Sequence, residues 1–344
     1  MAEESVSASV IGMLRAARHD YPDYVTLVED YYERGWTDGL PIVPPTPESV
    51  ERFLDHAGLA PDAVLGAVPT RDVVVTAEHA AINAVMAGCR PDYFPTVVAA
   101  VRAHLHEKGN CHSTTGTLSG ASQLVVVNGP VRNEIGIECR GACFGPGFRA
   151  NATIGRALRL VIRNVCRAVP GVFDRASLST PFRYSFCFGE DEEANAWNPL
   201  HVERGFSPEQ SAVTVHSTMI VCEVMDYMSR TPEAICDGWL AEILRRGIFA
   251  DRFVAEANIL IVVSAEHQRY FTQAGWSKAD VRGYLWRQCQ ASGENAKRIM
   301  LGGPEGFLIV GAGGPGHATT WLFFPHLAWA ITQAIEQASE PRRT

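Results

Sequence analysis

Hydrophobic and polar positions alternate along the chain in blocks that predict strands followed by helices. Apolar runs bounded by turn residues are typical of buried strands, and they lie at 73–75, 124–127, 214–224, 259–263 and 307–310. Helical spacing or a capping residue predicts helices at 21–35, 76–87, 94–106, 151–167, 265–274, 277–289 and 327–337, and one that begins at Thr46. This alternation predicts an α/β fold, with largely parallel β-sheet layers covered by helices.

Two glycine-rich segments, 141–149 and 311–316, are each expected between a strand and a helix. Glycine lets backbone amides approach a ligand, and a helix N-terminus adds partial positive charge, so such strand–Gly-loop–helix turns suit a phosphate or a carboxylate. Neither segment has the order of a Walker loop or of a dinucleotide fingerprint, and the alternative is a tight turn that needs glycine for packing. The candidate ligand-binding residues are Gly145, Gly147, Arg149, Asn151, Gly313, Gly314, Gly316 and His317.

Arginines recur at spacings of three and four in the helix predicted at 151–167; they are Arg156, Arg159, Arg163 and Arg167. Such a stripe is typical of a solvent-exposed helix face. Arg149 lies beside the first glycine-rich segment and is therefore the better candidate for holding an anion.

Thiols, imidazoles and a carboxylate supply the candidate catalytic residues, which are Cys89, Cys187, His112, Glu190 and His201. Cys89 follows a predicted helix end, and Cys187 lies in an alternating strand just before the acidic turn 189–193. We expect one of these thiols to act as nucleophile or acid/base, and Glu190 or a histidine to move protons. The alternatives are core cysteines and a solvated acidic loop.

A metal is a second chemical alternative. Cys139 and Cys143 have the spacing Cys-x-x-x-Cys beside the first glycine-rich segment, and Cys111 immediately precedes His112. A zinc or iron–sulfur site usually takes two close pairs of such ligands, and the chain has no second close cysteine pair. No cofactor is therefore predicted, and metal ligation by these four residues stays an alternative.

Composition and length limit the partners, the cellular location and the domain organisation that we expect. The chain has 344 residues, of which 47% are hydrophobic and 20% charged, with a net charge of −8, so neither nucleic acid nor an anionic membrane is an expected partner. The first residues do not predict a signal peptide, no apolar run reaches the roughly 18–20 residues of a membrane span, and nine cysteines are typical of reduced thiols; we expect a cytoplasmic protein. Seven Trp and 15 Phe favour a homo-oligomer. The length predicts two α/β regions, 1–205 and 206–344, or one composite domain.

Several long segments are similar to those of one family. They are Asp38–Thr46 (DGLPIVPPT), Ile82–Pro91 (INAVMAGCRP), Ala150–Ala157 (ANATIGRA) and Pro199–Phe206 (PLHVERGF). The chain resembles, over about residues 36–320, a broad family of bacterial, largely actinobacterial, cytosolic α/β proteins to which no reaction is assigned. The resemblance implies that Cys89, Cys187 and His112 occupy family positions. It also implies that Cys222 and Tyr227 replace histidines.

Together these features predict an enzyme of lyase or hydrolase type that acts on a small metabolite bearing a carboxylate or phosphate. A glycine-rich turn and Arg149 would hold the anion beside an ionisable sulfur. The alternatives are a metal- or redox-dependent enzyme that uses Cys and His ligands, and a non-catalytic ligand-binding or oligomeric subunit. All of these interpretations require distant segments to meet at one cleft.

Overall fold

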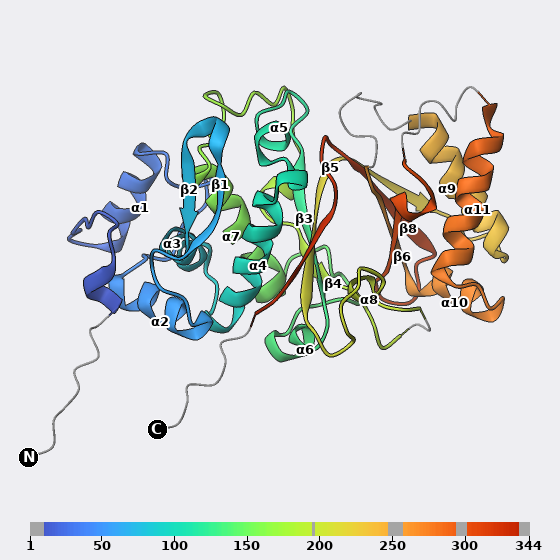
Figure 1. Ribbon diagram of the computed structural model, residues 1–344, viewed down its shortest axis with the longest axis horizontal. Helices are drawn as coiled ribbons and strands as arrows, with labels where there is room; N and C mark the ends of the chain where they lie inside the picture. Colours follow the sequence, from blue (N-terminus) through green and yellow to red (C-terminus); the bar gives the residue numbers. More distant parts are fainter. Residues whose placement is uncertain (1–9, 195–196, 247–256, 294–300, 337–344) are drawn as a thin grey trace, which may run out of the picture.

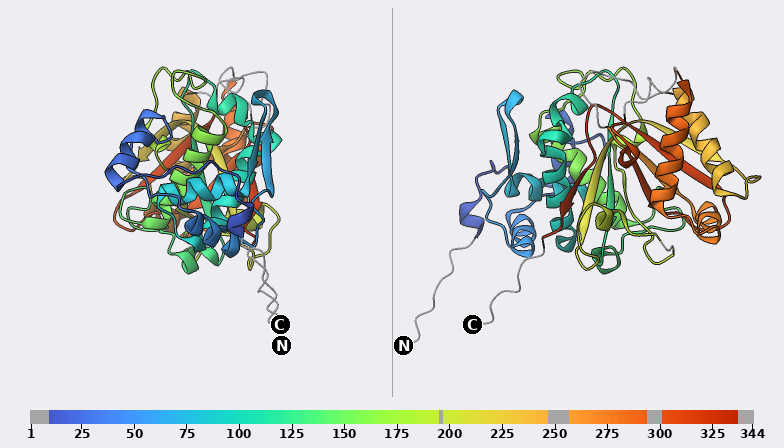
Figure 2. Two further views of the ribbon diagram at one scale, coloured as in Figure 1. Left: turned by 90° about the vertical axis from the view of Figure 1, so that its left-hand side faces the viewer. Right: turned by 45° about the vertical axis from the view of Figure 1, so that its right-hand side comes forward.

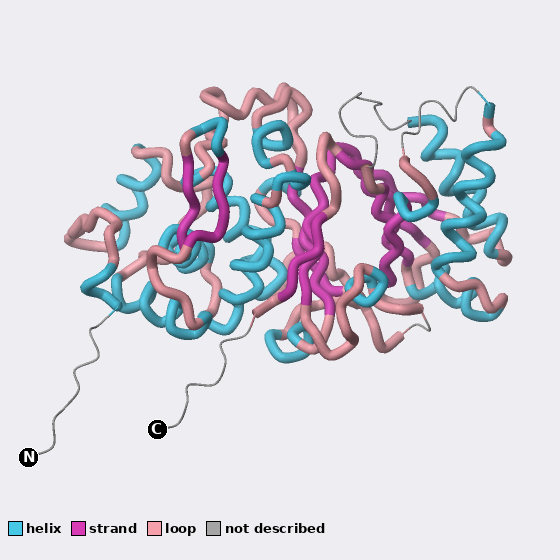
Figure 3. Tube along the Cα trace, in the orientation of Figure 1, coloured by secondary structure: helices cyan, strands magenta, loops and turns pink. Residues whose placement is uncertain are grey.

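One curled sheet of seven strands forms the centre of the molecule, in the order β4-β3-β5-β8-β6-β7, with β9 also paired to β5 (Figures 1 and 3). The computed structural model describes residues 10–194, 197–246, 257–293 and 301–336. The strands are β3 (Ser122–Asn128), β4 (Cys187–Gly189), β5 (Ala212–Met225), β6 (Ile259–Val263), β7 (Phe307–Gly311), β8 (Thr319–Pro325) and β9 (Ile331–Ala334). The sheet thus takes strands from both of the regions 1–205 and 206–344.

The sheet is mixed, which corrects the prediction of largely parallel layers. β3 pairs with β4, and β6 with β7, in parallel, whereas β5 is antiparallel to β3, β8 and β9, and β6 is antiparallel to β8. Continuous apolar runs do mark strands that are buried on both faces, but their pattern carries no information about strand direction. The mixed α/β class is confirmed, and the parallel arrangement is wrong.

Neither glycine-rich segment is a strand–Gly-loop–helix turn. The helix α6 (Val131–Ile135) lies between β3 and the first segment, which leads directly into α7 (Arg149–Leu160). The second segment joins β7 to β8, two strands, so no helix begins at His317. The helix predicted at 327–337 is also wrong, because β9 occupies its centre; Gln337 lies outside the described residues.

Helices cover the outer face of the sheet in two groups, one at each side (Figures 1 and 2). The first group contains α1 (Tyr24–Glu33), α2 (Pro47–Ala57), α3 (Ala77–Ala87), α4 (Phe94–Leu105), α5 (Cys111–Thr115) and α7, together with the antiparallel hairpin of β1 (Val64–Val68) and β2 (Val73–Thr76). The second group contains α9 (Pro232–Arg246), α10 (Ala265–Gln273) and α11 (Lys278–Ala291). The short α8 (Leu200–Glu203) follows the acidic turn. Within the described ranges, no helix is long and apolar enough to cross a membrane.

The alternation of side chains along β3 separates two hydrophobic cores. Val125 and Val127 pack outward against the first helix group, whereas Leu124 and Val126 face the inside of the curl. There they join Phe323 and other aromatic side chains. A third core lies between the second helix group and the outer face of β6, β7 and β8. The curled sheet therefore has an inner face that is distinct from both helix-covered outer faces.

One ion pair joins two of the segments that carry the family resemblance. Arg156 on α7 donates to both carboxylate oxygens of Asp38, each at 2.8 Å, and also to the carbonyl oxygen of Pro41 at 2.9 Å. This bidentate geometry fixes the proline-rich segment against α7.

Candidate functional site

The two glycine-rich segments meet at one cavity of about 380 Å³, which we call the glycine-rich cavity. A Cβ atom added to Gly314 would lie only 3.0 Å from the Cα atom of Gly141, so a side chain there would push the two backbones apart by a few tenths of an ångström. The amide of Gly313 donates to the carbonyl oxygen of Cys139 at 2.9 Å. Glycine therefore favours the close approach of two distant parts of the chain.

Half of the candidate ligand-binding residues line this cavity, namely Gly145, Gly313, Gly314 and His317. Gly147, Arg149, Asn151 and Gly316 are not among its lining residues. Arg149 donates instead to the carbonyl oxygen of Gly88 at 3.0 Å, and the amide of Gly316 donates to Glu266 at 3.0 Å. The side-chain amide of Asn151 donates to the carbonyl oxygens of Glu138 and Cys143, so Asn151 holds the first glycine-rich segment in place without lining the cavity.

Tyr227, His317 and Glu223 form a chain of hydrogen bonds, of which His317 and Glu223 line the cavity and Tyr227 does not. Nε2 of His317 lies 3.2 Å from Oε1 of Glu223, and Nδ1 of His317 bonds to the hydroxyl of Tyr227. Because a carboxylate only accepts, Nε2 carries the proton, and Nδ1 of the neutral ring then accepts from the Tyr227 hydroxyl. The hydroxyl of Thr319 also donates to Glu223, at 3.0 Å, and fixes its orientation.

The antiparallel pairing of β5 with β8 brings these residues together. Glu223 lies opposite Trp321 in the register, and Met225 lies opposite Thr319, so the end of β5 meets the start of β8. His317 lies two residues before the start of β8, and Tyr227 lies two residues after the end of β5. All three side chains of the hydrogen-bonded chain are accessible, since Glu223 and His317 are 37% and 47% exposed and Tyr227 is 49% exposed.

The sequence identified His317 as a candidate but missed Glu223, Tyr227 and Thr319. Tyr227 stood out only as a replacement for a histidine, and Glu223 lies in a strand that showed no chemical motif. The sequence analysis did not identify strand β8, whose register with β5 places Glu223 and Tyr227 near His317. Recognising the segment 319–325 as a strand would have placed both residues beside His317.

The candidate thiols do not reach the glycine-rich cavity. Cys89 and Cys187 are buried in the core under the first helix group, and both are at most 6% exposed. Burial raises the pKa of Cys89 to about 12 and raises that of Cys187 further. A thiolate is thus disfavoured at both positions near neutral pH, and the structure gives no support to cysteine catalysis there.

His112 lies elsewhere, on α5. Its Nδ1 atom is 2.7 Å from the hydroxyl of Thr70, and its ring packs edge-on against Phe173 with the ring centroids 5.4 Å apart. His112 is exposed but does not line the glycine-rich cavity. The predicted convergence of this histidine with Cys89 and Cys187 on one cleft is therefore not seen.

Glu190 and His201 belong to a buried polar network beside the sheet. Glu190 is 1% exposed and pairs with Lys278 at 2.8 Å, and its second oxygen accepts from the Asn128 side chain and the Leu200 amide, each at 2.7 Å. His201 is fully buried, with Nδ1 3.9 Å from Glu192. These residues bind segments of the protein to one another and do not line the glycine-rich cavity.

The arginine stripe on α7 is not a solvent-exposed face, which corrects that expectation. Arg159 is only 7% exposed, and Arg156 is held by Asp38, because this side of α7 faces the sheet and the segment before α2. Arg167, past the end of the helix, is the exposed member. Helical spacing identifies a common face but not its surroundings.

The metal alternative also finds no assembled ligand set. In the described parts of the chain, no group of three or more His, Cys, Asp and Glu side chains is arranged to hold a metal ion. Burial raises the pKa of Cys139 to about 11 and that of Cys143 to about 12. Cys111 and His112 lie on α5, apart from that pair. Metal ligation by these four residues stays a prediction.

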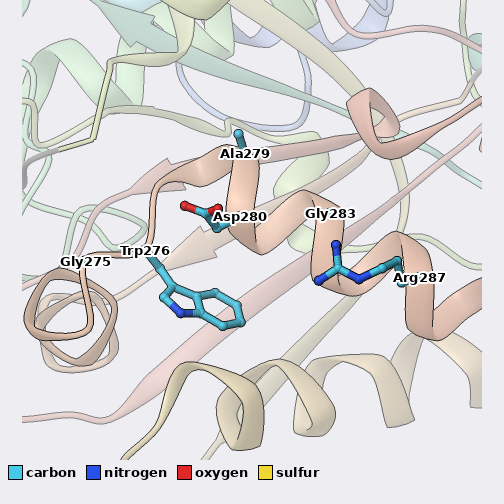
Figure 4. A pocket seen from close by; sticks show the side chains of 6 residues that line it. All are labelled: Gly275, Trp276, Ala279, Asp280, Gly283 and Arg287. Carbon is cyan, nitrogen blue, oxygen red and sulfur yellow. The ribbon is translucent and has the colours of Figure 1, made fainter.

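A further hollow of about 350 Å³ lies between α10 and the first turns of α11 (Figure 4). Asp280 in this hollow accepts from both the amide and the hydroxyl of Ser277, which completes the cap of α11. Arg287 lies about two turns further along the same helix and one turn beyond Gly283. The carboxylate is already used by the cap, so this hollow lacks the paired acid and base of the glycine-rich cavity.

None of the protein-family models, curated proteins or solved structures compared with this chain matches it. The resemblance carried by segments such as Asp38–Thr46 therefore stays a prediction, and the functional argument rests on the geometry of the cavity.

Proposed function

We propose that this protein is an enzyme of lyase or hydrolase type that acts on a small anionic metabolite in the glycine-rich cavity. The observation that carries the proposal is the hydrogen-bonded chain of Tyr227, His317 and Glu223, in which His317 and Glu223 line the cavity and Tyr227 lies beyond its lining. An imidazole between a carboxylate and a hydroxyl is the arrangement that catalytic triads use to move a proton. A tyrosine takes the place of the nucleophilic serine here, so the chemistry proposed is acid–base rather than covalent.

Each residue has a defined role in the proton transfer. Glu223 accepts from Nε2 of His317 and so keeps Nδ1 free to receive the phenolic proton of Tyr227. As that proton moves to Nδ1, the oxygen of Tyr227 removes a proton from a water molecule or from a part of the substrate that extends past His317, because Tyr227 itself lies outside the cavity lining. The imidazolium that forms is stabilised by Glu223, and the reverse transfer lets Tyr227 protonate a leaving group.

The size and lining of the cavity support a small anion as the substrate. A volume of about 380 Å³ lies near the lower end of the roughly 300–1,000 Å³ of ligand sites. Arg140 lines the cavity with its side chain 60% exposed, and the glycine segments bring backbone amides to the same place. Arg140 and these amides would hold a carboxylate or a phosphate. A cytoplasmic location and a homo-oligomer belong to the same proposal.

The test begins with the wild-type protein and a panel of small carboxylates and phosphate esters, followed by thermal shift for binding and by NMR for consumption. For any compound consumed, Tyr227→Phe and His317→Gln should lower kcat by about 10²–10⁴-fold without a change in Tm. Glu223→Gln should shift the pH profile of kcat/KM. Tyr24→Phe, which removes a half-exposed hydroxyl that lines neither cavity, is the matched control.

Two results separate the alternatives. If Tyr227→Phe, His317→Gln and Glu223→Gln all keep turnover within twofold of wild type, the proposed mechanism is refuted. Binding of a compound in this cavity without consumption would instead support the non-catalytic ligand-binding subunit. If the wild-type protein neither binds nor consumes any compound of the panel, the proposal of a small anionic substrate fails.

A further inference from the structure

Arg159 on α7 is a buried cation whose hydrogen-bond partners are neutral. Its Nε donates to the carbonyl oxygen of Arg183 at 3.1 Å, and a terminal nitrogen donates to the side-chain oxygen of Gln123 on β3. The structure gives Arg159 no ion pair with any carboxylate of the described residues. Burying a charge without a counter-ion costs free energy, and neutral hydrogen bonds offset only part of that cost.

Arg159 lines a cavity of about 210 Å³, which we call the arginine cavity, and two more arginines line it as well. Arg183 lies there paired with Asp174, and Arg163 lies there with a buried Nε that has no hydrogen-bond partner. The carboxylate of Asp38 also reaches this cavity, but Arg156 already binds both of its oxygens.

The charges around the arginine cavity do not balance. Each of the two aspartates is neutralised by one arginine, Asp38 by Arg156 and Asp174 by Arg183. Arg159 and Arg163 are then left without a carboxylate partner, an excess of two positive charges. Burial lowers the pKa of Arg159 to about 9 and also lowers that of Arg163. Since about 9 is well above neutral pH, Arg159 stays charged at pH 7.

We propose that the arginine cavity binds one small oxyanion, a carboxylate or phosphoryl group, between Arg159 and Arg163. Planar guanidinium groups bind such oxygens in pairs, and an anion there would supply the missing negative charge. The volume of about 210 Å³ is below that of most sites for larger ligands, so the bound group is small. Ser179 and Thr180 also line the cavity, where the Ser179 hydroxyl donates to the carbonyl oxygen of Gly120 at 3.3 Å and the Thr180 hydroxyl pairs with that of Ser122 at 3.0 Å.

This site is distinct from the glycine-rich cavity. The two cavities share no lining residue. Gln123, which holds Arg159, alternates with Leu124 along β3 and so points to the outer face with Val125. The glycine-rich cavity is lined by Phe144 and Trp321, which pack with the inner core. The proposal therefore does not depend on the proposed function.

The test measures the binding of inorganic phosphate and of succinate to the full chain, by thermal shift and by isothermal titration calorimetry. Sodium chloride at matched ionic strength is the reference. We expect a saturable rise in Tm for at least one probe and none for chloride. A response to only phosphate or only succinate identifies the group that the site prefers.

Three variants locate the binding. Arg163→Gln, at a half-buried position, should weaken binding of the probe at least tenfold, and Arg159→Met should abolish it. Without a probe, Arg159→Met should unfold at or above the wild-type Tm, because it removes an unpaired buried charge and keeps a similar volume. Arg167→Gln, on the same stripe but exposed and outside the cavity, should bind as the wild type does.

The outcomes are decisive in both directions. The proposal is overturned if neither probe raises Tm beyond chloride, or if Arg163→Gln and Arg159→Met bind as tightly as wild type. Binding that survives these two substitutions but is lost in Arg140→Gln places the anion in the glycine-rich cavity. That result overturns this inference and supports the proposed function. Loss of binding in Arg159→Met and Arg163→Gln, with binding kept in Arg140→Gln, supports the inference, whatever the enzyme assay shows.

Discussion

Replacing Lys278 by methionine should lower the free energy of unfolding by about 3 kcal/mol. Nζ of Lys278 lies 2.8 Å from Oε1 of Glu190, and the two side chains are 2% and 1% exposed. At this separation an effective dielectric constant of about 20 gives an attraction of about 6 kcal/mol, from which the desolvation of both charges must be subtracted. The variant leaves the Glu190 carboxylate buried without its cation. Breaking such a pair costs about 3–5 kcal/mol. The Asn128 side chain and the Leu200 amide still donate to the carboxylate, so we expect a cost near the lower end of this range.

Urea unfolding followed by tryptophan fluorescence measures this loss, with Trp276 beside the network as a reporter. The double variant Lys278→Met/Glu190→Gln should recover part of the stability, because it removes the unpaired charge as well. Arg245→Met is the matched control: its pair with Glu242 also measures 2.8 Å, but Arg245 is 65% exposed, so the urea midpoint should hardly change. If the Lys278 and Arg245 variants have the same midpoint, the reasoning about burial is wrong.

Two further predictions concern stability. Gly155→Ala should lower the free energy of unfolding by about 2 kcal/mol, because a Cβ there would lie 2.7 Å from the backbone nitrogen of Phe186. Gly238→Ala in α9, with its nearest contact at 3.9 Å, should raise it by about 0.5–1 kcal/mol, and equal urea midpoints for the two would contradict this contrast. Burial lowers the pKa of His216 to about 4, against about 6.5 in the unfolded chain. The unfolded state therefore binds a proton first as the pH falls from about 6.5 to about 4, so stability should drop by up to about 3 kcal/mol across that window. His216→Gln should flatten the drop in urea titrations at each pH; an unchanged slope would exclude His216 as its source.

Helix starts could be predicted because their signals are local. The side chains of Thr46, Thr76 and Ser277 each accept from an amide three residues ahead, and each begins a helix as expected. Gly88 ends α3 with a φ of 89°, also as expected. These interactions lie within one turn of chain, so the surrounding fold does not decide them.

Strand direction could not be predicted, because it depends on pairing between distant segments. The run at 307–310 is β7 as expected, yet the chain continues through glycine into β8 and not into a helix. The Thr319–Pro325 segment is apolar on both faces, a pattern that suits a buried strand or a buried helix equally. Without β8, the neighbours of Glu223 at the end of β5 could not be inferred.

The surroundings of the candidate catalytic residues could not be predicted from the sequence. Cys89 follows a helix end, which raises the pKa of a thiol, and precedes an arginine, which lowers it; the turn at Gly88 directs the chain back into the core. Glu190 lies in a run of four acidic residues that suits a solvated loop, but a lysine 88 positions away pairs with it inside the protein. In both cases the deciding neighbours are distant in sequence, and the catalytic roles stay predictions.

The acidic turn helps to hold the walls of the glycine-rich cavity, although Glu190 itself does not line it. The amide of Asp191 donates to the carbonyl oxygen of Gly311 at 2.8 Å, and its carboxylate pairs with Arg140 at 3.2 Å. Asp191 therefore joins the second glycine-rich segment to a residue that borders the first. Its neighbour Glu190 is fixed by Lys278 at the start of α11. Because the two walls carry His317 and Arg140, this turn helps to set the separation between the proposed proton relay and the proposed anion-binding group.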